Sequence, residues 1–150
     1  MENIVKRYWL MLPDFEWSHV LLRIPLALVF VQQGLNKVPL DFTMAHGLGI
    51  PELIWVFVTY GELLSGLGLL VGGVLSLKFV RDNVLLAFMG DALTRFSGIV
   101  MCCIVTGVFW TVIKPHSFAE VDMFHLFLWM GGLYFALRGN WVVASINKLS

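Results

Sequence analysis

The chain has 150 residues, of which 59% are hydrophobic and only 13% are charged. Soluble domains average about 25% charged residues, so this composition excludes an ordinary water-soluble domain and indicates an integral membrane protein with lipid as a partner. Ten basic and ten acidic side chains give a formal net charge of zero. Because no net positive charge attracts phosphates, the sequence also argues against nucleic-acid binding.

The first segment, residues 1–16, has a short apolar stretch behind Lys6 and Arg7. A secretion signal would need a longer apolar region and a small-residue cleavage site, whereas Asp14 and Glu16 follow here. We therefore expect this segment to lie in the membrane interface, with its aromatic side chains at headgroup level.

Four long apolar stretches follow, each close to the roughly 20 residues that a helix needs to cross a ~30 Å hydrocarbon layer. The predicted fold is therefore all-α, a membrane-spanning four-helix bundle in a single transmembrane domain over residues 1–150. Pro, Gly and Asp residues mark the first loop between the stretches. The expected spans are residues 17–37, 51–75, 92–113 and 121–137.

The stretch between the second and third spans, residues 76–91, allows two interpretations. Its apolar run is too short to span a membrane, which favours a short interfacial helix. Alternatively, the third span begins early and carries Asp91 and Arg95 inside it. We expect the interfacial helix.

Basic residues near the spans predict the orientation in the membrane. An even number of spans places the N-terminal segment, the middle connection and the C-terminal tail on one side. That side carries most of the basic residues, so both termini are expected in the cytoplasm. The basic residues there are Lys6, Arg7, Lys78, Arg81, Arg138 and Lys148, against Lys37 and Lys114 in the opposite loops.

The second span carries an acidic residue, Glu62, close to its middle. A charged side chain at the centre of a membrane helix costs at least about 2.5–3.5 kcal/mol on insertion scales, so Glu62 needs a partner or a function. A stripe of small residues beside it would let another helix pack closely, so Glu62 should face protein. The stripe consists of Gly61, Ser65, Gly68 and Gly72.

Two arginines enter from the cytoplasmic ends of the first and third spans. We expect Arg23, Glu62 and Arg95 to form a buried cluster. One interpretation is an ion network that fixes helix packing and nothing more. The other is a site whose surplus positive charge receives a quinone carbonyl, an anionic substrate or a proton in transit.

The outer end of the first span adds Gln33, Gly34 and Lys37 to the polar part of that helix. Lys37 is expected to snorkel to the interface. Metal-binding side chains gather further along the chain, but no recognised ligand spacing is present, so no metal site is predicted. The weak candidates are His116, Asp122 and His125.

Three runs of the sequence resemble the DoxX family of membrane proteins. LLRIPLALVFVQQGLNKV, residues 21–38, resembles the family's first helix through Arg23, Gly34 and Lys37. GELLSGLGLLVGG and LTRFSGIVMCC resemble its glutamate- and glycine-containing second helix and the Thr-Arg start of its third. The connection over residues 77–91 is longer than is usual in the family.

The resemblance implies a four-helix bundle in the bacterial inner membrane. Relatives include the small membrane subunit of thiosulfate:quinone oxidoreductase, so we expect an accessory or quinone-contacting subunit of a quinone-linked complex, rather than an enzyme on its own. A quinone would be its ligand, with no covalent cofactor, and redox metals would belong to other membrane subunits. Self-association is also open. The alternatives are a proton- or ion-coupled transporter that uses Glu62, and a structural scaffold docked through the glycine stripe.

Overall fold

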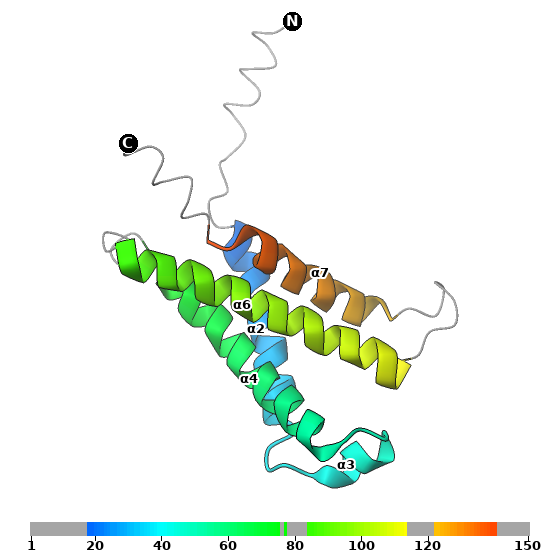
Figure 1. Ribbon diagram of the computed structural model, residues 1–150. Coiled ribbons are helices and arrows are strands. Elements are labelled where there is room, and N and C mark those ends of the chain that lie inside the picture. The colour runs from blue at the N-terminus through cyan, green and yellow to red at the C-terminus, as the bar shows by residue number, and fades with distance from the viewer. Residues whose placement is uncertain (1–17, 76, 78–83, 114–121, 141–150) are drawn as a thin grey trace, which may run out of the picture.

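All regular structure in the described part of the chain is helical (Figure 1). The structure, a computed structural model, describes residues 18–75, 77, 84–113 and 122–140. The expected all-α class is confirmed over these residues. The helices are α2 (Ser18–Leu35), α3 (Phe42–Gly47), α4 (Glu52–Val74), α6 (Val84–Val108), its π-helical continuation η1 (Phe109–Ile113) and α7 (Met123–Arg138).

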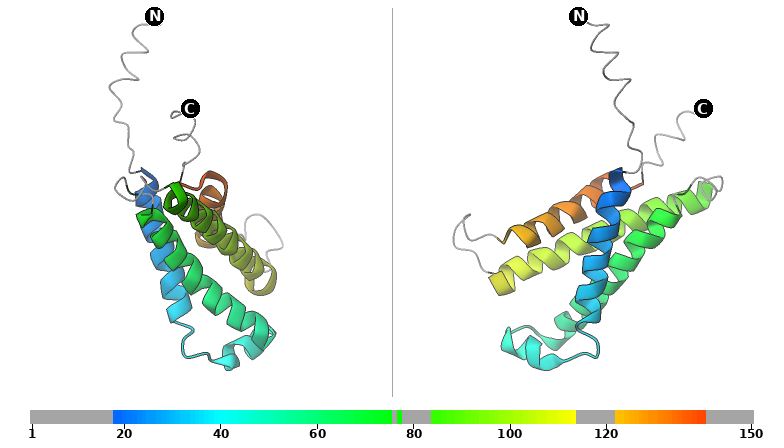
Figure 2. Two further views of the ribbon diagram at one scale, coloured as in Figure 1. Left: turned by 60° about the vertical axis from the view of Figure 1, so that its left-hand side comes forward. Right: turned by 180° about the vertical axis from the view of Figure 1, so that it is seen from behind.

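Four long helices pack in chain order, with α2 against α4, α4 against α6 and α6 against α7, whereas α2 and α7 touch only slightly. We call the end where α4 finishes and α6 begins the narrow end, because the helices converge there (Figures 1 and 2). Toward the opposite, open end the α2–α4 pair diverges from the α6–α7 pair, and α3 lies there beside α4. The result is a V of two helix pairs.

Glycines set the helix crossings, because a side chain at these positions would collide with the neighbouring helix. A Cβ on Gly66 would lie 2.8 Å from the carbonyl oxygen of Ala27, so α2 and α4 meet backbone to backbone. A Cβ on Gly98 would lie 2.5 Å from the carbonyl oxygen of Gly132, where α6 crosses α7. The small-residue stripe of α4 faces α6 through Gly61, Gly68 and Gly72.

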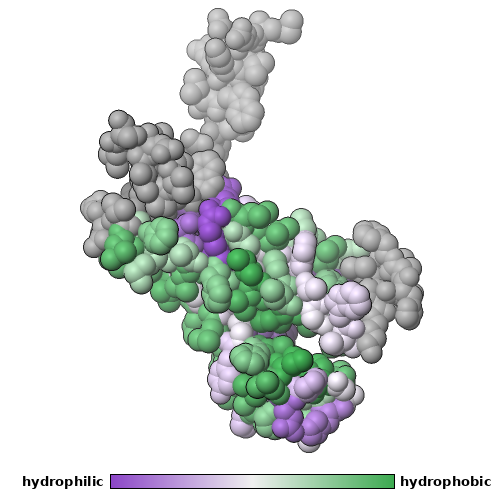
Figure 3. All heavy atoms as spheres, viewed as in Figure 1, coloured by the Kyte–Doolittle hydropathy of each residue, from purple (hydrophilic) through white to green (hydrophobic). Residues whose placement is uncertain are grey.

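Much of the apolar surface of these helices faces outward. The most apolar stretch of α4 is 39% buried inside the protein, and that of α6 only 22%. A core helix of a water-soluble protein would be mostly buried, so these faces suit lipid. Hydrophobic residues cover most of the face seen in Figure 3, between hydrophilic groups near the end of α7 and around α3. Large exposed side chains include Phe57, Leu64, Phe88, Phe96 and Phe127.

Two helices in the described part of the chain are long and apolar enough to cross a membrane, namely Glu52–Val74 and Leu85–Ile113. The apolar part of α2, Val20–Leu35, is shorter, and α7 has 16 residues. At 1.5 Å per residue such a helix extends roughly 24 Å, less than the ~30 Å hydrocarbon layer. The first candidate span agrees with the expected span 51–75, whereas the second begins seven residues before the expected span 92–113.

The predicted interfacial helix over residues 76–91 is wrong where the structure describes this stretch. α6 begins at Val84 and continues through Asp91 and Arg95. The third span was expected to begin after Asp91 because a charged residue usually ends an apolar stretch. Here Asp91 and Arg95 neutralise each other within the helix, with Arg95 Nε 2.8 Å from Asp91 Oδ2. Residues 76 and 78–83 lie outside the described residues, as does the N-terminal segment 1–16.

Candidate functional site

The expected cluster of Arg23, Glu62 and Arg95 does not form. Arg23 packs against Gly73 of α4, and Glu62 lies eleven residues earlier on that helix, roughly 16 Å away along its axis. Arg95 bonds to the end of α7. The antiparallel course of the two helices was expected, but the difference in depth was underestimated, because Arg23 lies level with the last turn of α4 and not with its middle.

Arg23 joins the helices at the narrow end. Its Nη1 donates to the carbonyl oxygen of Leu69 at 2.6 Å and to Thr94 Oγ1 at 3.2 Å, and its Nη2 donates to Asn140 Oδ1 at 2.5 Å. The guanidinium also lies over the ring of Phe135, 4.8 Å from the ring centroid. Because these contacts connect α2, α4, α6 and the end of α7, they favour a packing role for Arg23.

Arg95 and Asp91 hold the end of α7. Arg95 Nη1 donates to the carbonyl oxygen of Leu137 at 2.6 Å, and Nη2 donates to that of Arg138 at 3.1 Å. Asp91 Oδ1 accepts the backbone N–H of Asn140 at 2.5 Å. The last carbonyl groups of a helix have no partner within the helix, so this arrangement caps α7. Arg95 thus also has a packing role.

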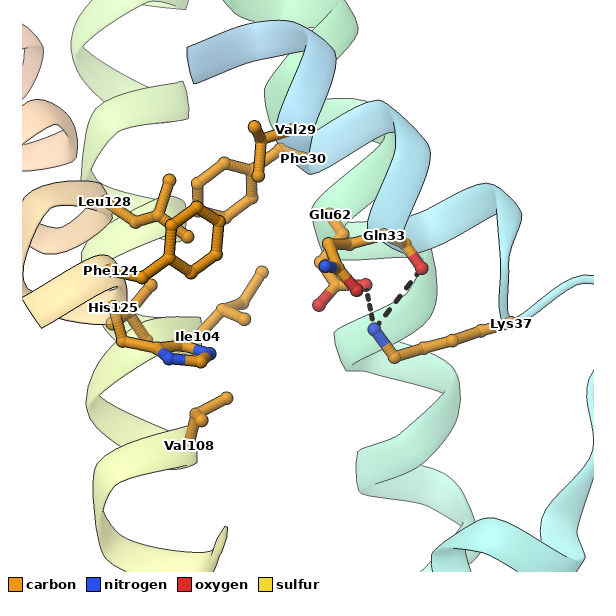
Figure 4. A pocket seen from close by; sticks show the side chains of 11 residues that line it. Val29, Phe30, Gln33, Lys37, Glu62, Ile104, Val108, Phe124, His125 and Leu128 are labelled. Carbon is orange, nitrogen blue, oxygen red and sulfur yellow. Dashed lines mark hydrogen bonds and ion pairs between the residues drawn. The ribbon is translucent and has the colours of Figure 1, made fainter. Parts of the chain in front are cut away.

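Glu62 pairs with Lys37, at the other end of α2. Lys37 Nζ lies 2.5 Å from Glu62 Oε2 and donates to the carbonyl oxygen of Gln33 at 3.3 Å (Figure 4). The two side chains are 16% and 7% exposed, so protein largely shields them. Gly34 brings α2 close enough, since a Cβ there would lie 2.9 Å from the backbone nitrogen of Leu63. The predicted snorkelling of Lys37 is therefore wrong.

Trp55 completes the surroundings of this ion pair. Lys37 Nζ lies 5.7 Å from the centroid of its ring, within the range of a cation–π contact. Trp55 is 6% exposed, and its indole Nε1 has no hydrogen-bond partner among the described residues. Leaving a buried donor unsatisfied costs about 1–3 kcal/mol, so this N–H is a group that a ligand oxygen could satisfy.

A large cavity opens between α4 and α6 toward the open end. Its volume is about 470 Å³, within the ~300–1,000 Å³ typical of ligand pockets. Lys37, Glu62 and Trp55 belong to its wall, so a polar spot interrupts a mainly apolar lining. The apolar wall includes Ile54, Phe57, Val58, Ile104, Val108 and Val112.

A smaller cavity of about 110 Å³ reaches the same ion pair from among α2, α4, α6 and α7. Gln33, Lys37 and Glu62 line one side of it, and His125 of α7 lies on the opposite side (Figure 4). His125 Nδ1 lies 2.5 Å from Asp122 Oδ2. The Lys37–Glu62 pair therefore lines both the larger and the smaller cavity.

Asp122 and His125 come together, but His116 lies outside the described residues. Within the described residues no three His, Cys, Asp or Glu side chains converge as a metal site would require. Cys102 and Cys103 carry free thiols, and Cys103 lines the larger cavity. The Cys103 thiol can therefore serve as a site for chemical labelling in the wall of the larger cavity.

Residues 18–77 match the family model described as DoxX. This part of the chain is similar to the DoxX family, and we call it the DoxX segment. The resemblance predicted from the sequence is confirmed over α2, α3 and α4, and the DoxX segment supplies Lys37, Trp55 and Glu62. The match and the two apolar candidate spans, of which Glu52–Val74 lies within the matched residues, are features expected of a membrane protein. No curated protein and no solved structure matches the chain.

The sequence contained signals for the contact between Lys37 and Glu62 that the prediction missed. Lys37 follows Gly34 by three residues, so it extends from the place where a glycine allows α2 to touch α4. Trp55 precedes Glu62 by seven residues, about two helical turns, which puts both on one face of α4. His125 was considered only as a metal ligand, although its ring lines a cavity with Glu62.

Proposed function

We propose that this protein is a small membrane subunit that binds a quinone in the larger cavity. The proposal depends on one observation: a shielded Lys37–Glu62 pair lies in the wall of an apolar cavity of about 470 Å³, next to the unpaired indole N–H of Trp55. An apolar pocket with a few placed polar groups is the usual form of a small-molecule site. The quinone contact is thus assigned to this pair and no longer to Arg23 and Arg95.

The ion pair offers the hydrogen-bonding groups that such a ligand needs. The Lys37 ammonium can donate to a quinone carbonyl, and the Trp55 N–H can donate to another ligand oxygen. The Glu62 carboxylate can accept a hydrogen bond from the hydroxyl of the reduced form. The apolar wall would hold the ring and tail, whose burial contributes roughly 25 cal/mol per Å². The site therefore suits both the oxidised and the reduced ligand.

The same proposal places the protein in the bacterial inner membrane, with α2, α4, α6 and α7 as four spans and both termini in the cytoplasm. Support comes from the DoxX segment and from the excess of basic residues predicted for one side. The shorter helices α2 and α7 would cross with local thinning of the bilayer. Electron-carrying groups would belong to partner subunits, which makes this chain an accessory binding subunit.

Quinone binding is tested with the purified protein in lipid nanodiscs. A short-tailed ubiquinone analogue should quench tryptophan fluorescence saturably and should slow alkylation of Cys103 by a lipophilic maleimide. Lys37→Met should weaken binding about tenfold or more, because a hydrogen bond from a charged donor contributes about 1.5–3 kcal/mol.

A matched control is available at the open end. His46 Nε2 lies 3.0 Å from Glu52 Oε1 in an exposed pair that lines neither cavity. His46→Gln should therefore bind the analogue like the unmodified protein. A wild-type protein that shows neither saturable quenching nor protection of Cys103 would refute quinone binding.

A proton-coupled transporter is the second candidate, since a cavity of about 110 Å³ reaches Glu62 from among all four long helices. An intramembrane carboxylate at such a place is a common ion-coupling group. Proteoliposomes loaded with a pH-sensitive dye should then show a proton flux that Glu62→Gln abolishes without unfolding the protein.

The structure argues against the scaffold alternative, because the glycine stripe on α4 is not free to bind a partner. A Cβ on Gly68 would lie 2.5 Å from Ser97 Oγ, so the glycine stripe is already occupied by α6 of the same chain. Gly68→Leu would therefore disturb the internal packing before it could affect a partner.

A further inference from the structure

The smaller cavity has polar groups at two opposite sides and apolar side chains between them. Gln33, Lys37 and Glu62 line it from α2 and α4, and His125 lines it from α7 (Figure 4). Its volume is about 110 Å³, and one water needs about 10–15 Å³ of such space. The cavity therefore has room for several waters, with polar groups at each side to bond them.

His125 connects this cavity to the surface. Its side chain is 30% exposed and that of Asp122 is 44% exposed, so solvent reaches the pair. Asp122 Oδ2 bonds Nδ1 of the imidazole at 2.5 Å. A carboxylate on one ring nitrogen fixes the tautomer, so Nε2 is the nitrogen that can exchange a proton with water.

We propose that the smaller cavity is a proton passage between Glu62 and the Asp122–His125 pair. A proton from bulk water binds His125, passes along waters in the cavity and arrives at the Glu62 carboxylate. Neutral Glu62 then no longer balances the charge of Lys37, which becomes free to bind a ligand oxygen. The passage uses the carboxylate of the proposed quinone site, but its operation requires no quinone.

The charged groups that face this route belong to few elements. Glu62 faces Lys37 from the turn that follows α2, and His125 from α7. His125 faces Asp122 on its own side and the edge-on ring of Phe109 from η1. α6 presents the Cys103 thiol to the larger cavity and the uncharged Ile104, Val105 and Val108 to the smaller one.

The passage is tested by a stopped-flow jump from neutral to acidic pH on the full-length protein in nanodiscs, without quinone. Trp55 is the reporter, because Lys37 Nζ lies 5.7 Å from its ring centroid and shifts when Glu62 is neutralised. The fluorescence change should vanish in Trp55→Phe and in Glu62→Gln. His125→Gln should slow it about tenfold or more, as expected when a proton-transfer group is removed.

Two further variants keep the test decisive. Val29→Phe fills the smaller cavity without touching the larger one, and it should slow the signal as His125→Gln does. His46→Gln, which alters an exposed pair outside both cavities, should leave the rate unchanged. Wild-type rates in both His125→Gln and Val29→Phe would overturn the proposal, because protons would then enter by the larger cavity. Failure here leaves quinone binding intact, since no quinone is present.

Discussion

At the scale of single residues, the Lys37–Glu62 pair has the largest consequences. Its side chains are 16% and 7% exposed, so both charges have lost most of their hydration. Their mutual attraction offsets that loss only while both are present. Removal of one partner therefore leaves an uncompensated charge beside an apolar cavity, whereas removal of both leaves none.

A double-mutant cycle should show this coupling. Lys37→Met and Glu62→Leu should each lower the free energy of unfolding by about 3 kcal/mol. The double variant should be less destabilised than the sum of the two, by about 2 kcal/mol. The free energies come from SDS titrations in mixed micelles followed by circular dichroism. Strict additivity would show that the two side chains do not interact.

At the scale of helices, the surroundings of a glycine decide what a methyl group does there. Gly98 lies where α6 crosses α7, and a Cβ on it would lie 2.5 Å from the backbone nitrogen of Ala136. Gly107, on the same helix, has nothing within 4 Å of its Cβ position. The same substitution should therefore have opposite effects at the two positions.

Gly98→Ala should destabilise the protein by about 2 kcal/mol, because backbone atoms cannot yield as a flexible side chain can. Gly107→Ala should be neutral or stabilising by up to about 1 kcal/mol, through the higher helix propensity of alanine. SDS titration of both variants beside the wild type measures the difference. Equal destabilisation by the two substitutions would contradict the crossing seen between α6 and α7.

The start of α7 should be sensitive to acid. Asp122 caps this helix by accepting the backbone N–H of Phe124 at 2.9 Å. Hydrogen bonds from the His125 side chain and then from this N–H hold the pKa of Asp122 below its ordinary value of 3.8. The cap therefore contributes fully above pH 3.8 and is lost as the pH falls through the lower folded pKa.

Hydrogen exchange of the first turn of α7 measures this loss. Protection of the amides should fall in the wild type below about pH 4, where the unfolded carboxyl also begins to bind protons. Asp122→Asn keeps a capping side chain without the titrating group, and its protection should change little over that range. An acid-induced loss of the same size in both proteins would assign it to another group.

At the scale of the whole molecule, the V shape explains why the ion pair is accessible at all. Arg23 and its partners connect the helices at the narrow end, whereas the helix pairs diverge toward the open end (Figure 1). Lys37 and Glu62 lie where the two arms separate, so both cavities reach them.

The four-span arrangement predicts on which side each connection lies. With Cys102 and Cys103 replaced by alanine, Thr43→Cys and Leu77→Cys place single exposed thiols at opposite ends of α4. A membrane-impermeant maleimide added to intact cells without an outer membrane should label Thr43→Cys, and should label Leu77→Cys only after lysis. Labelling of both from outside would refute the proposed topology.

The sequence by itself determined the helical class, the apolar character of the helices, the DoxX resemblance and the need of Glu62 for a partner. These depend on composition and on local spacing along one chain, so they can be read without coordinates. The glycine stripe also indicated close helix packing, although the sequence did not show which helix packs against it.

Only the tertiary structure decided which cation Glu62 meets. Arg23, Arg95 and Lys37 all flank the second span in the predicted bundle, and which of them meets Glu62 depends on the offset of α2 against α4. Gly34 faces Leu63, and Arg23 faces Gly73, so Lys37 reaches the carboxylate and Arg23 does not. Such offsets arise from contacts between residues far apart in the chain, which local patterns do not encode.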